Sequence, residues 1–200
     1  MPAALSRPAV AGPLVLVAML VAVALTRLLP HPPNFTPVAA LALFGAAHFA
    51  HRGWAVAVPL LALFLSDIAL GFASGALGLG WTADTALYAE YMLSPLALGI
   101  YASTLLAGLP GFALRGRASA RRVLGAGVAS ALVFFFASNA VAWLGARPGE
   151  PCVAGIGPCY VAALPFLKWT LAGTLFYSAL LFGGFALLRR ALPPLRPQTA

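Results

Sequence analysis

Charged residues are scarce in this sequence. Its 200 residues include 12 lysines and arginines and 4 aspartates and glutamates, or 8% of the chain, whereas soluble domains carry about 25% charged residues. So few charges could hardly cover a surface in water, which excludes a soluble protein. Hydrophobic residues make up 62% of the chain, and its mean hydropathy is +0.96. Because lipid-facing positions are apolar, the composition predicts an all-α transmembrane protein.

The sequence also lacks the motifs of common catalytic and metal centres. It contains no HExxH, CxxC or GxSxG pattern and no Walker loop. We expect His31 on the outer side and His48 and His51 at the inner end, so these histidines cannot form one metal site. We therefore predict no enzyme, no metal and no cofactor. The basic residues lie between apolar runs rather than along one face, which argues against a nucleic-acid partner.

Long apolar runs define the expected topology. A transmembrane helix needs roughly 17–25 apolar residues, and five runs reach this length, whereas a sixth run, 38–50, is short. It is either a short helix completed to a span by its flanks, which we favour, or a re-entrant segment buried in protein. We expect one six-helix domain over residues 1–192 and a flexible proline-rich tail over 193–200. The expected spans are 9–26, 38–50, 54–72, 93–111, 123–144 and 166–188.

Basic residues orient these spans, because cytoplasmic loops carry an excess of lysine and arginine. With six spans and both termini inside, nine basic residues face the cytoplasm and three face outwards. The inner set is Arg7, Arg52, Arg115, Arg117, Arg121, Arg122, Arg189, Arg190 and Arg196, and the outer set is Arg27, Arg147 and Lys168. A five-span topology gives the same totals, so charge does not decide between them. We expect a multi-pass protein of the bacterial cytoplasmic membrane.

Polar and aromatic residues gather on the predicted outer side. Polar residues are costly in a membrane and therefore informative, and we place Asp67 and Asn139 in the outer third of their spans. A small-molecule pocket combines apolar walls with a few polar anchors. The predicted substrate-binding residues are His31, Asn34, Phe35, Asp67, Asn139, Trp143, Tyr160 and Lys168.

Each of these residues also has a simpler interpretation. Asp67 could instead pair with Arg27, and Asn139 could bond a neighbouring helix. The aromatic residues could form an interfacial belt. Lys168 follows Pro165, which suits a helix start; a cation in a first turn is mildly unfavourable, so either an anion compensates it or the side chain extends to the surface.

The two cysteines lie seven residues apart in one predicted outer loop. An extracytoplasmic location permits a disulfide between Cys152 and Cys159. The alternative is two unpaired thiols without a role.

Four segments carry a resemblance to a known family. They are RLLPHPPNFTPVAALALFGAAHF (27–49), PLLALFLSDIALGF (59–72), FFFASNAVAWL (134–144) and CYVAALPF (159–166). They resemble a family of uncharacterised bacterial membrane proteins described as putative transport proteins. That family is similar to the substrate-binding S components of energy-coupling-factor (ECF) importers. The resemblance implies six helices, an extracytoplasmic pocket and an alanine stripe, here Ala42, Ala46 and Ala50, that contacts a coupling subunit.

These observations lead to a main hypothesis and its alternatives. The main hypothesis is a substrate-capture component of a micronutrient importer, embedded in the lipid bilayer and energised by partner ATPases through a coupling subunit. The first alternative is a secondary carrier coupled to protons through Asp67, and another is a non-transport scaffold or sensor. A membrane enzyme that uses Asp67 and His31 is disfavoured, because the sequence contains no recognisable set of catalytic residues.

Overall fold

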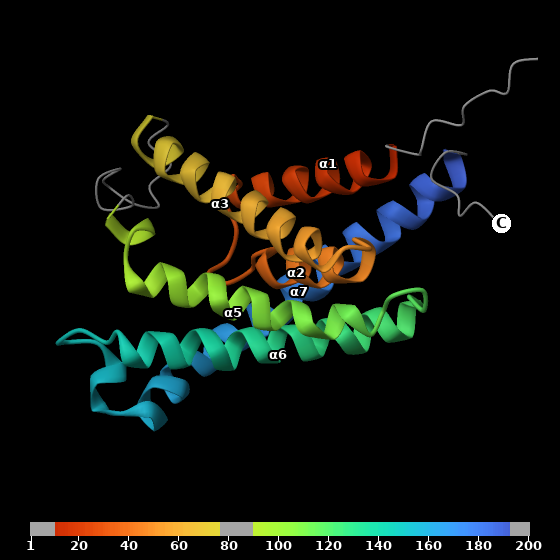
Figure 1. The fold of residues 1–200 in the computed structure, drawn as a ribbon. Helices are drawn as coiled ribbons and strands as arrows, with labels where there is room; N and C mark the ends of the chain where they lie inside the picture. The colour runs from red at the N-terminus through yellow and green to blue at the C-terminus, as the bar shows by residue number, and fades with distance from the viewer. Residues whose placement is uncertain (1–10, 77–89, 193–200) are drawn as a thin grey trace, which may run out of the picture.

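The computed structural model describes residues 11–76 and 90–192, and this part of the chain is helical without any strand (Figure 1). The predicted tail over 193–200 and the start of the first predicted span lie outside the described residues. The elements are α1 (Ala11–Leu25), η1 (Thr26–Leu28), α2 (Val38–His48), α3 (Arg52–Ala76), α5 (Pro95–Phe112), α6 (Ala120–Leu144), η2 (Pro151–Ala154) and α7 (Ile156–Ala191).

Four of these helices are long and apolar enough to cross a membrane. They are Arg52–Phe72 within α3, Pro95–Phe112 (α5), Ala120–Leu144 (α6) and Ile156–Ala191 (α7). The apolar helices at Gly12–Leu28 and Val38–His48 are shorter. The predicted all-helical class is therefore confirmed for the described residues, together with four helices that are apolar enough to span a membrane.

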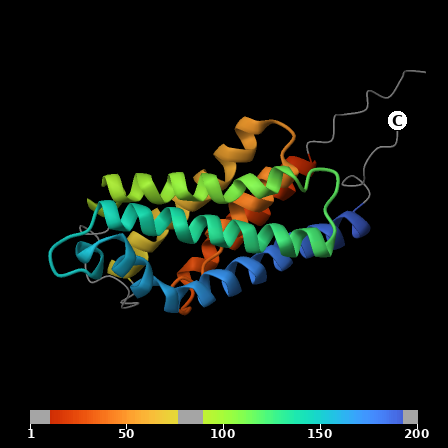
Figure 2. The ribbon, with the colours of Figure 1, turned by 90° about the horizontal axis from the view of Figure 1, so that it is seen from below.

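The helices run side by side along one axis, so the bundle has two distinct ends (Figure 1). At one end α1, α3 and α6 begin and α2, α5 and α7 end; we call this the arginine-rich end. The opposite end, where η2 joins α6 to α7, is the disulfide end. Figure 2 shows α5, α6 and α7 side by side along the bundle. The arginine-rich end carries Arg52, Arg115, Arg117, Arg121, Arg122, Arg189 and Arg190.

The short helix α2 lies in the centre of the bundle. It contacts α1, α3, α5, α6 and α7, and every residue from Val38 to Ala46 is buried. Its 11 residues rise about 16 Å, roughly half of a hydrocarbon core of about 30 Å. The run 38–50 therefore does not cross a membrane as a helix by itself. A crossing at this place therefore has to include the flanks of α2, and the choice between a completed span and a re-entrant segment stays a prediction.

The N-terminal end of α2 lies level with the middle of α7. A Cβ atom added to Gly173 would lie 2.8 Å from the Thr36 nitrogen and 3.1 Å from the Phe35 Cα. The segment just before α2 thus packs directly on the α7 backbone, 17 residues beyond the first residue of α7. The chain returns from the end of α1 into the bundle before α2 begins.

The C-terminal end of α2 is held by Arg115, which follows α5. Its guanidinium donates to the carbonyl oxygens of Ala46 (2.9 Å), Phe49 (2.7 Å) and Ala50 (3.2 Å), and it lies 4.7 Å from the Phe112 ring centroid. The last carbonyls of a helix have no partner within the helix, and a cation there also opposes the partial negative charge of the helix end. Arg115 therefore supplies hydrogen-bond donors and positive charge to the C-terminal end of α2.

Only the last residue of the predicted alanine stripe is accessible at the surface. Ala42 and Ala46 are 6% and 3% exposed, and only Ala50 is exposed to solvent or lipid. Both buried alanines face glycines of α5, since a Cβ added to Gly108 would contact Ala42 and one added to Gly111 would contact Ala46. Ala42 and Ala46 thus pack inside this chain, which corrects their prediction as a surface for a coupling subunit.

The last helix begins ten residues earlier than predicted. α7 starts at Ile156, and Pro165 lies in its interior. Pro165 is therefore not a helix start, and Lys168 lies in the fourth turn rather than the first. The argument that Lys168 opposes a helix dipole does not hold in this structure.

The contact between α2 and α5 gives a first prediction. A Cβ at Gly111 would lie 2.3 Å from the Leu43 oxygen and 2.8 Å from the Ala46 Cβ, and neither neighbour is a flexible side-chain end. We expect Gly111→Ala to lower the free energy of unfolding by about 1–3 kcal/mol through overpacking. Thermal unfolding in detergent measures this loss.

Gly125→Ala on α6 is the matched control. Nothing lies within 4 Å of a Cβ built at Gly125, so the change leaves packing intact and raises helix propensity, a gain of up to about 1 kcal/mol. Equal effects of the two substitutions would contradict the close contact of α2 with α5.

Candidate functional site

A buried ion pair joins the end of α1 to α3. Arg27, in η1, donates to the Asp67 Oδ1 and also to the Ser66 Oγ at 2.6 Å. The Arg27 and Asp67 side chains are only 15% and 7% exposed. This is the one salt bridge found among residues 11–76 and 90–192. Ionisable groups inside a membrane protein are costly and usually functional, so the pair is the first candidate site.

Neighbouring hydroxyl groups fix the geometry of the pair. Tyr101 on α5 donates to the second carboxylate oxygen of Asp67 at 2.5 Å, and Ser66 donates to the Leu63 carbonyl at 2.7 Å. The Thr26 hydroxyl donates to the Val23 carbonyl at 2.7 Å, and its oxygen lies 3.0 Å from the Tyr177 hydroxyl oxygen. We call Arg27, Ser66, Asp67 and Tyr101 the charged cluster. It draws residues from η1, α3 and α5 to one point.

A cleft at the disulfide end lies beside the charged cluster. It has a volume of about 470 Å³ between the start of α5 and the end of α6. Its lining residues are Glu90, Tyr91, Ser94, Leu96, Ala142, Gly145, Arg147 and Glu150. Five of these eight residues are polar or charged, although most of the surface that they expose to the cleft is apolar.

Tyr91 connects the cleft to the charged cluster. Burial raises the pKa of the Tyr91 phenol, the negative charge of Asp67 raises it further, and the positive charge of Arg27 opposes this shift. The Tyr91 side chain lines the cleft while it is close enough to both charges to respond to them.

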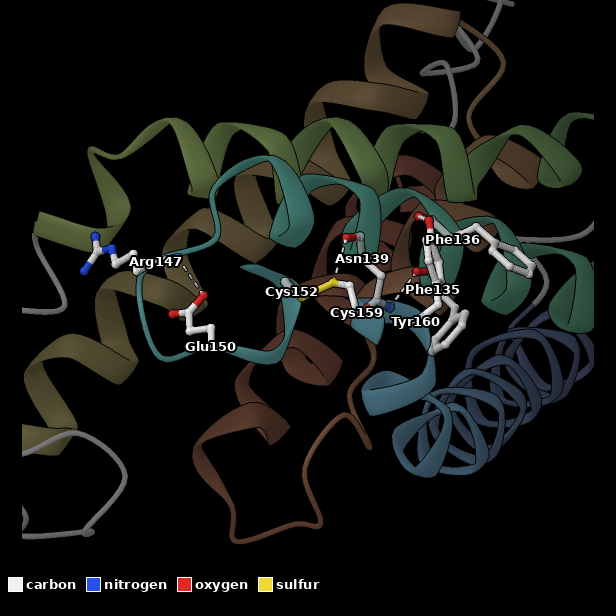
Figure 3. The surroundings of a disulfide bond; sticks show 8 residues. All are labelled: Phe135, Phe136, Asn139, Arg147, Glu150, Cys152, Cys159 and Tyr160. Atoms are coloured by element: carbon white, nitrogen blue, oxygen red, sulfur yellow. Dashed lines mark hydrogen bonds between the residues drawn. A yellow bond between two sulfur atoms is a disulfide. The ribbon is translucent and has the colours of Figure 1, made fainter. Parts of the chain in front are cut away.

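A second cluster of polar residues surrounds the disulfide between Cys152 and Cys159 (Figure 3). Cys159 is buried, and its sulfur lies 3.7 Å from the Asn139 carbonyl oxygen. The Asn139 amide donates to the Phe135 carbonyl at 2.8 Å within the same helix. The Tyr160 hydroxyl donates to the Phe136 carbonyl at 2.6 Å. The Tyr160 bond and the Cys159 contact hold the start of α7 against α6, whereas the Asn139 bond lies within α6.

The structure does not bring the predicted substrate-binding residues into one pocket. Asp67 lies on α3 and Asn139 on α6, and these two helices do not contact each other. Lys168 is exposed and lies 5.3 Å from the ring centroid of its neighbour Trp169. Trp143 is also exposed, at 38%.

The predicted residues of the first loop have local roles. Asn34 is exposed and adopts a positive φ of 65°, a conformation that asparagine tolerates better than most residues. Phe35 packs on Phe176 and Tyr177, with ring centroids 5.7 and 5.8 Å apart. The His31 Nδ1 lies 3.0 Å from the Pro32 carbonyl oxygen. None of these contacts involves the charged cluster.

Sequence reasoning found part of the charged cluster. It named the pairing of Asp67 with Arg27 as an alternative, and the structure has this pairing. Tyr101 was missed, although a tyrosine in the middle of an apolar run is a signal of the same kind. No group of three or more His, Cys, Asp or Glu side chains that could hold a metal occurs in the part of the chain that the structure describes.

The fold and the charged cluster define a helical membrane protein with an ion pair inside its bundle. The chain belongs to DUF6580, a family of unknown function, which matches it over residues 9–195. No curated protein and no solved structure matches the chain.

The ion pair gives a second prediction, which a double-mutant cycle tests. Removing one partner of a buried pair leaves an uncompensated charge, so we expect Arg27→Gln or Asp67→Asn alone to cost about 3–5 kcal/mol. The double variant removes both charges. We expect its loss in free energy of unfolding to be smaller than the sum of the losses of the two single variants. Unfolding of the four proteins in the same detergent measures the coupling; strictly additive losses would show that the two groups do not interact.

Proposed function

We propose that this protein is a substrate-capture component for the import of a small molecule across the bacterial cytoplasmic membrane. The observation that carries the proposal is the cleft at the disulfide end, with the charged cluster beside it. Its volume of about 470 Å³ lies in the range of ligand pockets, roughly 300–1,000 Å³. The polar and charged side chains that line it supply anchoring groups for a ligand.

The proposal includes a topology of six membrane crossings with both termini in the cytoplasm. The loop before α2 and α2 itself together make the second crossing, since the helix alone is too short. The arginines at one end of the bundle support placing that end inside. The cleft and the disulfide then face outwards, where disulfides persist.

The charges of the cleft suit a ligand with a cationic or hydrogen-bond-donating group. Glu90 and Glu150 line it together with Arg147, and the Arg147 backbone nitrogen already donates to the Glu150 Oε2 at 3.1 Å. A micronutrient of vitamin size with such a group meets these requirements. Transport energy would come from partner ATPases through a coupling subunit, because the sequence has no nucleotide-binding loop.

A second candidate function is proton-coupled transport by this chain alone. The observation in its favour is that Asp67 is the only acid within the membrane-spanning candidates of the described chain. This second hypothesis predicts that the protein alone takes up substrate into liposomes under a pH gradient and that Asp67→Asn abolishes the uptake. The capture component predicts binding without such uptake.

Filling the cleft is the test of the capture function. Ala142 lines the cleft, so Ala142→Trp should remove ligand binding. Ala129 lies on the same helix, is exposed and does not line the cleft; Ala129→Trp is therefore the matched control. We expect native mass spectrometry of gently purified protein to show a retained small molecule in the unmodified chain and in Ala129→Trp, but not in Ala142→Trp.

Thermal shift across a panel of vitamins and other micronutrients then identifies the ligand. We expect one compound to stabilise the unmodified chain and to lose this effect in Ala142→Trp. The capture proposal fails if no small molecule is retained and no compound of the panel raises the unfolding temperature.

A further inference from the structure

A second, larger groove lies at the other end of the bundle, between α6 and α7. Its volume is about 710 Å³. Its apolar walls include Val123 and Leu124 of α6 and Leu175, Ala179, Phe182 and Phe185 of α7. From Leu175 to Arg189 the groove follows α7 for about 21 Å, which exceeds one leaflet of a hydrocarbon core of about 30 Å. Neither the charged cluster nor the cleft shares a residue with it.

The polar end of this groove is positively charged. Arg189 and Arg190 line it together with Ser119, the N-cap residue of α6. The Arg189 guanidinium lies 5.9 Å from the ring centroid of Phe185, which itself lines the groove. The N-terminus of α6 adds partial positive charge. No acid of the described chain lines the groove.

We propose that this groove binds one anionic phospholipid. Its phosphate would lie between Arg189, Arg190 and the start of α6, and an acyl chain would extend along the apolar walls towards Leu175. Charge complementarity selects an anionic headgroup, because guanidinium groups bind phosphate through charge-assisted hydrogen bonds. The length of the apolar walls selects a lipid, since a free anion would occupy only the charged end. Basic pockets between membrane helices are suited to such headgroups.

The site is independent of the proposed import function. It lies at the arginine-rich end, whereas the cleft lies at the disulfide end (Figure 1). Loss of lipid binding would therefore leave the capture proposal intact, and failure to find a substrate would leave this site intact.

Two pairs of matched variants test the charged and the apolar part separately. Arg189→Gln with Arg190→Gln removes two charges that line the groove, and Arg52→Gln with Arg117→Gln removes two exposed charges of the same end that do not line it. Gly183→Phe fills the groove, while Gly125→Phe adds the same ring to α6 outside it. A Cβ at either glycine meets nothing within 4 Å, so both phenylalanine variants are compatible with folding.

The measurement is native mass spectrometry of the full chain titrated with dioleoyl phosphatidylglycerol or dioleoyl phosphatidylcholine. We expect one saturable phosphatidylglycerol site that binds the anionic lipid roughly tenfold more tightly than the zwitterionic one. The Arg189/Arg190 double variant should weaken it by roughly the same factor, and Gly183→Phe should abolish it. The Arg52/Arg117 double variant and Gly125→Phe should retain it.

Several results would overturn the proposal. Equal binding of the two lipids, or equal losses in both arginine double variants, would show nonspecific attraction to the basic end. Full competition by inorganic phosphate would indicate a small-anion site without an acyl chain. Lipid binding that occurs only after truncation behind Leu192 would show that the chain's own end occupies the groove. Unfolding temperatures of all variants, measured in parallel, identify any loss that comes from misfolding.

Discussion

The length of α2 is the constraint on which the rest of the structure depends. A helix of 11 residues rises about 16 Å and must place one end within the apolar part of a membrane protein, where water cannot satisfy its backbone. Five helices surround α2. The end that lies inside the bundle is its N-terminal end, level with the middle of α7. Its C-terminal end lies at the arginine-rich end, where the Arg115 guanidinium binds the Ala46 carbonyl and the two carbonyls of Phe49 and Ala50 that follow the helix. Glycines on α5 and α7 follow from the same requirement, because only they let the backbones approach so closely.

The position of α2 also explains why the candidate sites lie at opposite ends. α2 fills the core towards the arginine-rich end, where Phe44 packs edge-on against Phe182 and Phe185. His48, at the end of α2, lines the groove between α6 and α7. Towards the disulfide end the chain instead brings together Arg27, Asp67 and Tyr101. A packed apolar centre therefore separates a charged cleft from a basic groove.

The sequence predicted the helices well and the contacts between them poorly. Apolar runs predicted the ends of α5 and α6 to within a few residues, because every helix that spans the lipid must be apolar over a similar length. The start of α7 was wrong because a proline can lie inside a helix, as Pro165 does. Asp67 and Asn139 were expected to share a pocket because both lie in the outer third of their predicted spans. The depth of a residue in the membrane does not specify which helices are neighbours. Arg27 could be paired with Asp67 only because the sequence offers so few charges.

The central claim is that α2 is a buried partial helix whose C-terminal end depends on Arg115. The unfolding of Arg115→Met compared with that of Arg117→Met tests it most directly, since Arg117 is exposed two residues further along the chain. Losing charged hydrogen bonds to three carbonyls should lower the free energy of unfolding by about 3 kcal/mol or more in Arg115→Met, with almost no change in Arg117→Met. Equal stability of the two variants would contradict the account.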